Sequence, residues 1–296
     1  MFALGIDIGG TMIKTGVVDS SGALSGKRLY ATSLDLKEQL MEIVQEELTS
    51  NKLDAIGIGT AGRVDPITEC VSLATANLPN WTGIPLKSLI EEKTGVHTAV
   101  LNDANAAALG EWFCNYPHKE TLVMLTVGTG LGGGVIINGK PLPGKRGEAG
   151  EFGHVVLHPG GKPCNCGKAG CAEEYVSMRL IHSLAAAAAG HEMTRATLIE
   201  QYLNGNPVVE MAVNTVAADL AIMIDSVFLS FDPDIVVVGG GVCELGSRFL
   251  ESLREELASL SGSSLYTPDD VVLSLSGNNA GIIGAAVYAM ARGKNR

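Results

Sequence analysis

The stretch that decides the fold is LGIDIGGTMIKTGVV at residues 4–18. Two apolar runs flank the bend Gly9-Gly10-Thr11, which predicts a strand, a tight turn and a second strand. The same order returns in LVMLTVGTGLGGGVII at residues 122–137, where a glycine-rich bend at 128–134 separates two apolar runs. An Asn138-Gly139 turn closes the second copy. Each half of the chain is therefore predicted to open with a β-hairpin bent at glycines.

The glycines of these two bends suit phosphate binding. Residues without a Cβ can adopt positive φ and let backbone N–H groups converge on an anion. The repeat, together with Asp7 in its first copy, favours this interpretation over plain hairpin turns. Neither bend has the Gly-Lys-Ser/Thr of a P-loop, and neither leads into a helix as a Rossmann fingerprint requires. The expected phosphate-binding residues are Asp7, Gly9, Gly10, Thr11 and Lys14 in the first copy and Gly128, Thr129, Gly130, Gly132 and Gly133 in the second.

A third glycine element follows the apolar run at residues 235–238. That run predicts a strand buried on both faces, and a helical pattern at 245–260 follows it. Ligands of open α/β sheets bind beyond the carboxyl ends of strands, which is where Gly239, Gly240 and Gly241 lie. We expect these glycines to bind the nucleoside end of a phosphate donor, although packing alone would explain one of them.

A candidate general base lies where a short strand should end at Leu101 and an alanine-rich helix should begin after Asp103. The positive end of a helix favours an ionised carboxylate, which suits a base that accepts a hydroxyl proton. The alternative is a helix N-cap, whose side chain accepts from N–H groups of the first turn. Both roles can coexist across Asn102 and Asp103.

A set of soft metal ligands lies between the two glutamates Glu151 and Glu173. Four such ligands make a closed tetrahedral zinc site with no open position for water, so one structural Zn²⁺ per chain is expected. His158 is a rival for the fourth position. A disulfide network is the alternative, disfavoured because no secretory signal precedes it. The expected ligands are His154, Cys164, Cys166 and Cys171.

Composition narrows the setting of this chemistry. At 296 residues the chain exceeds a single core, and its 46% hydrophobic residues and 37 glycines fit an α/β enzyme. A net charge of -11 opposes a nucleic-acid partner. The most apolar helical stretch, 217–231, is interrupted by Asp219 and Asp225, so we expect no membrane span and a cytoplasmic protein.

Several of these motifs together resemble those of the ROK family of bacterial sugar kinases and sugar-responsive repressors. The resemblance spans essentially the whole chain and implies an α/β, actin- and hexokinase-like fold. In that fold two RNase H-like domains close on ATP-Mg²⁺ and a hexose in the interdomain cleft. The motifs are those at residues 7–11, 102–103, 128–134, 151–154 and 164–173.

The resemblance implies an ATP-dependent hexose kinase, first of all a glucokinase that makes glucose 6-phosphate. By that similarity Asp103 is the catalytic base and Asp7 lies near the metal-bound phosphates. Arg63 is similar to an arginine of some N-acetylmannosamine kinases, which keeps an N-acetylhexosamine or β-glucoside as the alternative substrate; a surface salt bridge to Asp65 is the other interpretation. The implied sugar contacts are Gly62, Asn77, Asn102, Glu151, His154 and Glu173.

The same similarity sets the domain limits. We expect a first domain at 1–117, joined by a C-terminal helix at 279–292, and a larger second domain at 118–278 that holds the zinc ligands. A repressor would need a helix-turn-helix for which the first strand, beginning at Ala3, leaves no room. A non-catalytic sugar-binding or zinc-scaffold protein would have lost the base or the phosphate loops, which are intact. The expected partners are a hexose, ATP and a second copy of the chain.

Overall fold

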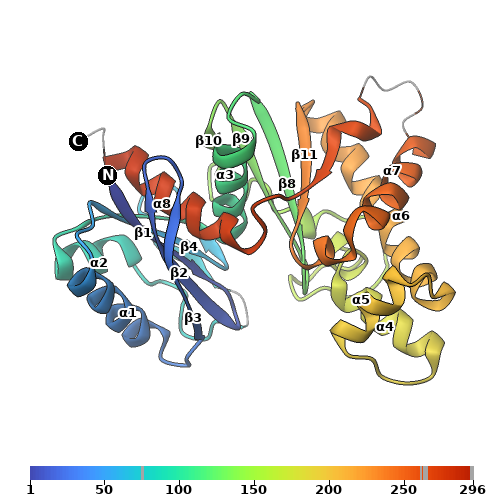
Figure 1. Cartoon of the computed structure of the whole chain (residues 1–296), viewed down its shortest axis with the longest axis horizontal. Helices are drawn as coiled ribbons and strands as arrows, with labels where there is room; N and C mark the ends of the chain where they lie inside the picture. Colours follow the sequence, from blue (N-terminus) through green and yellow to red (C-terminus); the bar gives the residue numbers. More distant parts are fainter. Residues whose placement is uncertain (75–76, 261, 263–265, 294–296) are drawn as a thin grey trace. The chain divides into compact units, whose positions relative to one another are not determined.

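The computed structural model describes residues 1–74, 77–260, 262 and 266–293. The chain forms two compact units, each with helices packed on a β-sheet (Figure 1). The first unit comprises Met1–His118, Gly134–Gly150 and Asn278–Arg296, and the second comprises Lys119–Gly133 and Glu151–Gly277.

Residues 134–150, which the sequence analysis assigns to the larger domain, group with the first unit instead. The reason is contact with α3 (Asp103–Asn115). A Cβ on Gly134 would lie 2.8 Å from the Cβ of Ala108, so the segment lies directly on that helix. Later in the same segment, Glu148 Oε1 forms an ion pair with Arg63 Nη2 at 2.8 Å.

The sheet of the first unit has the strand order β3-β2-β1-β4-β7. Strand β1 runs antiparallel to β2 and parallel to β4, which is parallel to β7. The register places Asp7, Gly59 and Leu101 side by side, so the carboxyl ends of three parallel strands meet at one edge. The strands are β1 (Phe2–Ile8), β2 (Met12–Asp19), β3 (Leu24–Ala31), β4 (Ala55–Thr60) and β7 (His97–Asn102).

The two faces of this sheet differ in residue size because side chains alternate along each strand. Leu4 and Ile6 point into a core shared with α1 (Leu36–Ser50) and α2 (Leu86–Thr94). The intervening Gly5 faces α8 (Ala280–Gly293), where a Cβ would lie 2.1 Å from the carbonyl oxygen of Ile282. Glycine therefore lets α8 lie directly on the strand backbone, beside α3 (Figure 1).

The second sheet has the order β10-β9-β8-β11-β12, with β8 (Thr121–Val127) parallel to β11 (Ile235–Gly239). The remaining strands are β9 (Leu131–Ile137), β10 (Lys140–Pro141) and β12 (Val271–Leu273). Because β9 begins at Leu131, Gly132 and Gly133 lie inside a strand and not in the bend where the sequence analysis places them. Glycine can occupy a strand because the pairing of strands uses only backbone groups.

The helices of the second unit are α4 (Met178–Ala189), α5 (Arg195–Leu203), α6 (Pro207–Phe231) and α7 (Gly246–Leu260). By length and composition α6 could cross a membrane, contrary to the expectation drawn from its two aspartates. In its most apolar window, however, 56% is buried within the protein. Both aspartates are also paired: Asp219 with His158, and Asp225 with the hydroxyl of Tyr266. Such burial favours a core helix.

Short elements complete the chain. A two-stranded hairpin joins β5 (Arg63–Val64) to β6 (Val71–Leu73) in the first unit. The 3₁₀ turns are η1 (Phe152–His154), η2 (Ala172–Glu174), η3 (Gly241–Leu245), η4 (Pro268–Asp270) and η5 (Gly277–Asn279).

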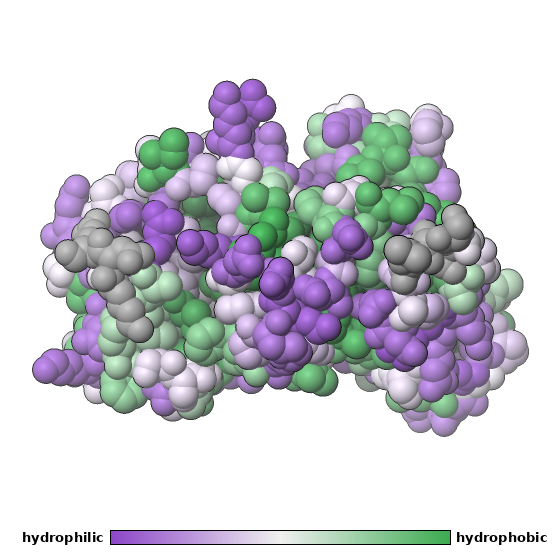
Figure 2. Space-filling view, turned by 90° about the horizontal axis from the view of Figure 1, so that it is seen from above, coloured by the Kyte–Doolittle hydropathy of each residue, from purple (hydrophilic) through white to green (hydrophobic). Residues whose placement is uncertain are grey.

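Hydrophilic and hydrophobic residues are interspersed on the face of the molecule shown in Figure 2. Leu34 and Leu275 are two large apolar side chains that are exposed. Single exposed apolar residues are usual on globular proteins and need no functional explanation.

Candidate functional site

The junction of β7 and α3 holds the candidate base. Asn102 is the N-cap: its Oδ1 accepts the N–H groups of Ala104 and Asn105 at 2.9 and 3.1 Å. Asp103 is the first helical residue, and its Oδ1 accepts from Asn102 Nδ2 and from the Ala104 N–H, both at 2.9 Å. The two roles weighed for this pair are thus divided, because Asn102 caps the helix and the Asp103 carboxylate is fixed, half-buried, at its positive end.

Asn102 also connects the base to the β5–β6 hairpin. Its Nδ2 donates to the carbonyl oxygen of Gly62 at 3.0 Å. Gly62 has a φ of +97°, and a Cβ there would lie 2.6 Å from the carbonyl oxygen of Leu73. This position therefore requires glycine for both conformation and space. The structure brings Gly62, Asn102 and Asp103 together, as the sequence analysis expects of sugar-contacting residues.

The first glycine bend lies at the same sheet edge. Asp7, at the end of β1, pairs through Oδ2 with Lys14 Nζ at 2.9 Å. A Cβ on Gly10 would lie only 2.7 Å from the Cβ of Asn77, so the expected sugar residue Asn77 lies against the bend. Neither Gly9 nor Gly10 has positive φ. The expected reason for these glycines is therefore wrong, because they provide close approach and not a left-handed backbone.

Arg63 extends from β5 toward residues of the segment 134–150. Its Nη2 pairs with Glu148, whereas Asp65 accepts from the N–H groups of Ile67 and Thr68 in its own turn. The proposed salt bridge to Asp65 is therefore wrong, because that carboxylate already closes a local turn. Glu148 was missed by sequence reasoning, since no local pattern links residues so far apart in the chain.

In the second unit, the glycine turns that follow β8 and β11 lie side by side, because these two strands are paired in parallel. The register pairs Gly239 with Thr126, and Gly240, with a φ of +84°, would place a Cβ 2.6 Å from the carbonyl oxygen of Val127. Arg195 was not expected here, but its Nη2 donates to the carbonyl oxygen of Gly241 at 3.2 Å. The Gly128–Gly130 bend and the Gly239–Gly241 turn therefore form one glycine-lined edge.

The predicted zinc ligands converge within the second unit. The candidate ligand atoms of His154, Cys164, Cys166 and Cys171 all lie within 4.8 Å of one another. Cys166 Sγ lies 3.5 Å from Cys171 Sγ, and Cys164 Sγ lies 3.8 Å from His154 Nδ1. Zinc–sulfur bonds of about 2.3 Å in a tetrahedron give ligand separations of roughly 3.8 Å. The four residues therefore fit a zinc ion.

Both alternatives for this cluster disagree with the structure. None of the six cysteines, all of which lie in the described part of the chain, forms a disulfide, so the disulfide network is wrong. His158 does not join the cluster, because its Nε2 lies 2.7 Å from Asp219 Oδ1 on α6 and its ring packs on Tyr175. The four-ligand set predicted from spacing is the set that the structure brings together.

The thiols differ in acidity. Burial raises the pKa of Cys164 and of Cys171 above the ordinary thiol value. Burial acts the same way on Cys166, but the backbone N–H of Lys168 and the neighbouring thiols outweigh it and lower the pKa of that residue. Cys166 is thus the thiol that loses its proton first, and a metal ion would displace the protons of the other two.

Glu173 connects the metal-ligand cluster to the second glycine bend. Its Oε1 accepts from Cys164 Sγ at 3.0 Å and lies 3.5 Å from His154 Nδ1. Its Oε2 would lie 2.8 Å from a Cβ on Gly130. Glu151 begins the turn that holds His154, because its carbonyl oxygen accepts the N–H of His154 at 3.0 Å. The expected sugar residues Glu151, His154 and Glu173 therefore belong to one local cluster.

The chain matches the ROK family over residues 3–292. A glucokinase of Streptomyces coelicolor is 34% identical, with 97% of this chain and 96% of that relative covered. An N-acetylmannosamine kinase of Yersinia pseudotuberculosis is 31% identical, with 97% and 98% covered. Among solved structures, a ROK family glucokinase from Streptomyces griseus in complex with glucose and AMPPNP superposes with a TM-score of 0.86 at 32% identity, covering 98% of this chain and 100% of that one.

Proposed function

Because the chain belongs to the ROK family, we propose that it is an ATP-dependent hexose kinase that phosphorylates the 6-hydroxyl of glucose. The observation that carries this proposal is the common sheet edge of the first unit. There Asp7 lies near the end of β1 and Asp103 follows β7, so the first glycine bend and a fixed carboxylate lie at the carboxyl ends of two parallel strands that are separated by β4. Phosphoryl transfer needs this combination of positioned phosphates and a positioned base.

The residues of the first unit supply the base and part of the phosphate site. Asp103 accepts the proton of the attacking hydroxyl, and Asn102 holds its carboxylate through the bond from Nδ2. Gly62 and Asn77 contact the sugar. Backbone N–H groups at Gly10 and Thr11 bind phosphate oxygens together with Lys14, whereas the N–H of Gly9, also expected to bind phosphate, donates to the carbonyl oxygen of Met12 at 3.0 Å and closes the bend. Mg²⁺ arrives with ATP, and Asp7 is the carboxylate that would hold it.

The residues of the second unit supply sugar recognition and the rest of the phosphate site. Glu151 and Glu173 accept hydrogen bonds from sugar hydroxyls, and the ring of His154 donates one. The glycines of the two adjacent turns bind the phosphates and the nucleoside of ATP. A site of this kind rejects deoxy sugars, because its half-buried acceptors would lose their partners.

Zinc has a structural role in this proposal. Bound by His154, Cys164, Cys166 and Cys171, it holds the imidazole in one tautomer and one orientation. It therefore acts on the sugar site through geometry alone. Free thiols at a zinc site require a reducing compartment, which supports the cytoplasm as the place of action. A homodimer is also part of the proposal, and light scattering on the purified protein tests it.

The first test is an assay of hexoses, N-acetylhexosamines and β-glucosides with ATP-Mg²⁺. Glucose should be phosphorylated on its 6-hydroxyl. Asp103→Asn should then lower kcat by roughly 100-fold or more, the scale expected for loss of a general base. Its thermal midpoint should stay close to wild type, because Asn102 still caps α3. Near wild-type kcat in this variant would remove Asp103 from the mechanism.

An N-acetylhexosamine kinase is the second candidate, and one feature of Arg63 favours it. Its Nε is buried and has no hydrogen-bond partner among the described residues. A buried donor without a partner is costly, and the carbonyl of an N-acetyl group would satisfy it. Arg63→Met should then lower kcat/KM for N-acetylmannosamine far more than for glucose. Equal losses on both sugars would exclude this role.

A further inference from the structure

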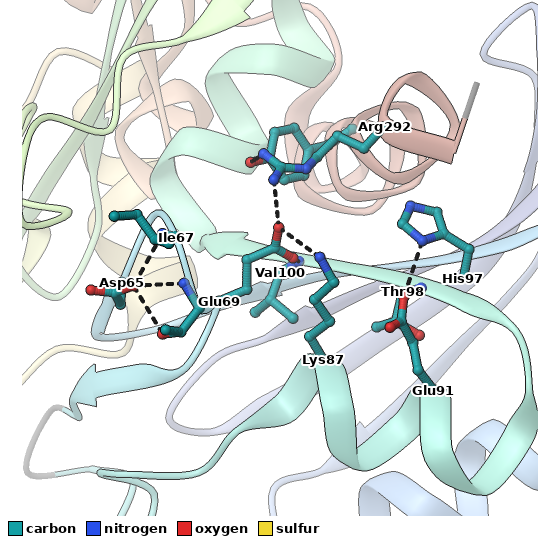
Figure 3. A network of polar contacts seen from close by, with 11 residues as sticks. Asp65, Ile67, Glu69, Lys87, Glu91, His97, Thr98, Val100 and Arg292 are labelled. Atoms are coloured by element: carbon teal, nitrogen blue, oxygen red, sulfur yellow. Dashed lines mark hydrogen bonds and ion pairs between the residues drawn. The ribbon is translucent and has the colours of Figure 1, made fainter. Parts of the chain in front are cut away.

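A buried carboxylate in the turn between β5 and β6 contacts β7, the strand that leads into the candidate base. Glu69 is 1% exposed. Its Oε2 accepts the backbone N–H of Val100 in β7 at 2.8 Å. Its Oε1 lies 2.9 Å from Arg292 Nη2 of α8 and 3.4 Å from Lys87 Nζ of α2 (Figure 3). One side chain thus joins three elements of the first unit to its own turn.

This arrangement carries two costs. Burial of a carboxylate is unfavourable unless cations and hydrogen bonds compensate for its lost hydration. Glu69 also has a φ of +55°, in the left-handed region that residues with a Cβ disfavour. An apolar residue of similar size would avoid the first cost but not the second, so the contacts of this carboxylate are what distinguish it from such a residue.

The contact with Val100 lies on the open edge of the sheet. Strand β7 ends the strand order, so alternate N–H groups on its outer side lack a strand partner. Two carboxylates accept them: Glu91 Oε1 takes the N–H of Thr98 at 3.0 Å, and Glu69 takes that of Val100. The next outward position along the strand is Asn102, the N-cap beside the candidate base.

The turn that carries Glu69 is therefore tied to β7 at two points. At its start, the carbonyl oxygen of Gly62 accepts from Asn102 Nδ2. At its end, Glu69 accepts from Val100. Between these points lies Arg63, and Asp65 closes the turn by accepting from Ile67 and Thr68 (Figure 3). Movement of Glu69 would shift the turn relative to the strand that leads into Asp103.

We propose that Glu69 is a positioning residue for sugar phosphorylation: it sets the place of Gly62 and Arg63 relative to Asn102 and Asp103. This inference rests on the proposed kinase function and adds a residue that touches neither substrate. Lys87 and Arg292 hold the carboxylate in place, which makes the ends of α2 and α8 part of the support for the sugar-contacting turn.

The test compares Glu69→Gln with Glu91→Gln. Both changes replace a carboxylate that accepts an N–H from the same edge strand, but only Glu69 belongs to the sugar-contacting turn. The two oxygens of Glu69 serve different donors, so an amide must turn its NH₂ toward either Val100 or Arg292. In Glu91 a single oxygen, Oε1, faces both the N–H of Thr98 and Nδ1 of His97, so the amide oxygen of Glu91→Gln can keep these contacts.

Both variants should unfold at a lower temperature than wild type, and the decrease should be smaller for Glu91→Gln, whose amide oxygen can keep the contacts with Thr98 and His97. Glu69→Gln should also lower kcat/KM for glucose by roughly 10-fold, mainly through KM, because small displacements of substrate-positioning groups are amplified in the rate. Its KM for ATP should change by less than about two-fold, and Glu91→Gln should leave the KM for glucose within the same margin.

If Glu69→Gln loses stability but keeps the wild-type KM for glucose, as Glu91→Gln should, Glu69 is structural only and the inference is overturned. A wild-type protein that phosphorylates none of the tested sugars would instead refute the kinase proposal itself, before any variant is compared. If Glu69→Gln does not fold, Arg292→Gln is tested in its place, because the side chain of Arg292 is 41% exposed. That variant should raise the KM for glucose by about three-fold, and an unchanged KM would again overturn the inference.

Discussion

The two glycine hairpins share one backbone order but differ in charge. In the first, Asp7 ends β1 and forms an ion pair with Lys14. Thr126 occupies the corresponding position in the second hairpin. The bend of that hairpin lies against Glu173, which comes from elsewhere in the second unit. In the proposed kinase the first hairpin would therefore act on phosphates through its own charges, whereas the second would act through backbone N–H groups and its contact with a neighbouring carboxylate.

Asp7→Asn should have the largest effect on kcat, because it removes the charge that distinguishes the first hairpin from the second. Loss of the carboxylate removes the charge proposed to hold the metal ion of ATP, and kcat should fall by roughly 100-fold to 1000-fold, the scale for loss of one electrostatic contact to a transition state. Steady-state kinetics at saturating glucose and Mg²⁺ measure it. The matched control is Asp19→Asn at the far end of β2, where the carboxylate accepts from Ser21 and Ala23.

The Asp19→Asn control should keep kcat close to wild type. If Asp7→Asn does the same, the charge difference between the hairpins has no role in catalysis, and the assignment of the metal to the first unit fails.

Gly130→Ala tests the contact of the second hairpin with Glu173, because the substitution should displace that side chain. The added Cβ would lie 2.8 Å from Glu173 Oε2, which is the far end of a flexible side chain, so the cost in stability should be small. The cost should appear in sugar binding, as a rise of roughly 10-fold in the KM for glucose. Gly128→Ala is the matched variant in the same bend, because its Cβ would meet no protein atom within 4 Å.

Gly128→Ala should leave the KM for glucose unchanged, and any loss it causes should fall on the KM for ATP. Equal KM values for glucose in the two variants would show that the second hairpin does not act through Glu173.

Cys166→Ser should have the smallest effect on turnover. It should abolish the one expected zinc per chain, lower the thermal midpoint and raise the KM for glucose by about five-fold, since the metal only orients the sugar-binding residues. The KM for ATP should hardly change. Metal analysis by mass spectrometry measures the first outcome, and Cys114→Ser, on α3 of the other unit, is the control that should keep its zinc.

A fully active wild-type enzyme with far less than one zinc per chain would contradict this account. The second hairpin would then depend on Glu173 alone and not on the metal cluster beside it.

The features that the sequence predicts well are those with local causes. Alternation of apolar residues around glycines predicts both hairpins, and the spacing of His154, Cys164, Cys166 and Cys171 predicts the cluster that the structure assembles. The N-cap at Asn102 follows from the chemistry of a strand-to-helix junction. Each of these depends on residues within a few turns of one another, where the chain has few alternative conformations.

Only the tertiary structure decided the rest. It shows that Gly5 admits α8, that residues 134–150 join the first unit, that Arg63 pairs with Glu148 and that Glu69 accepts from Val100. The partners in each case are far apart along the chain, so no spacing or periodicity connects them. Their meeting depends on strand order and helix packing, which arise from the summed burial of many side chains and not from any short motif.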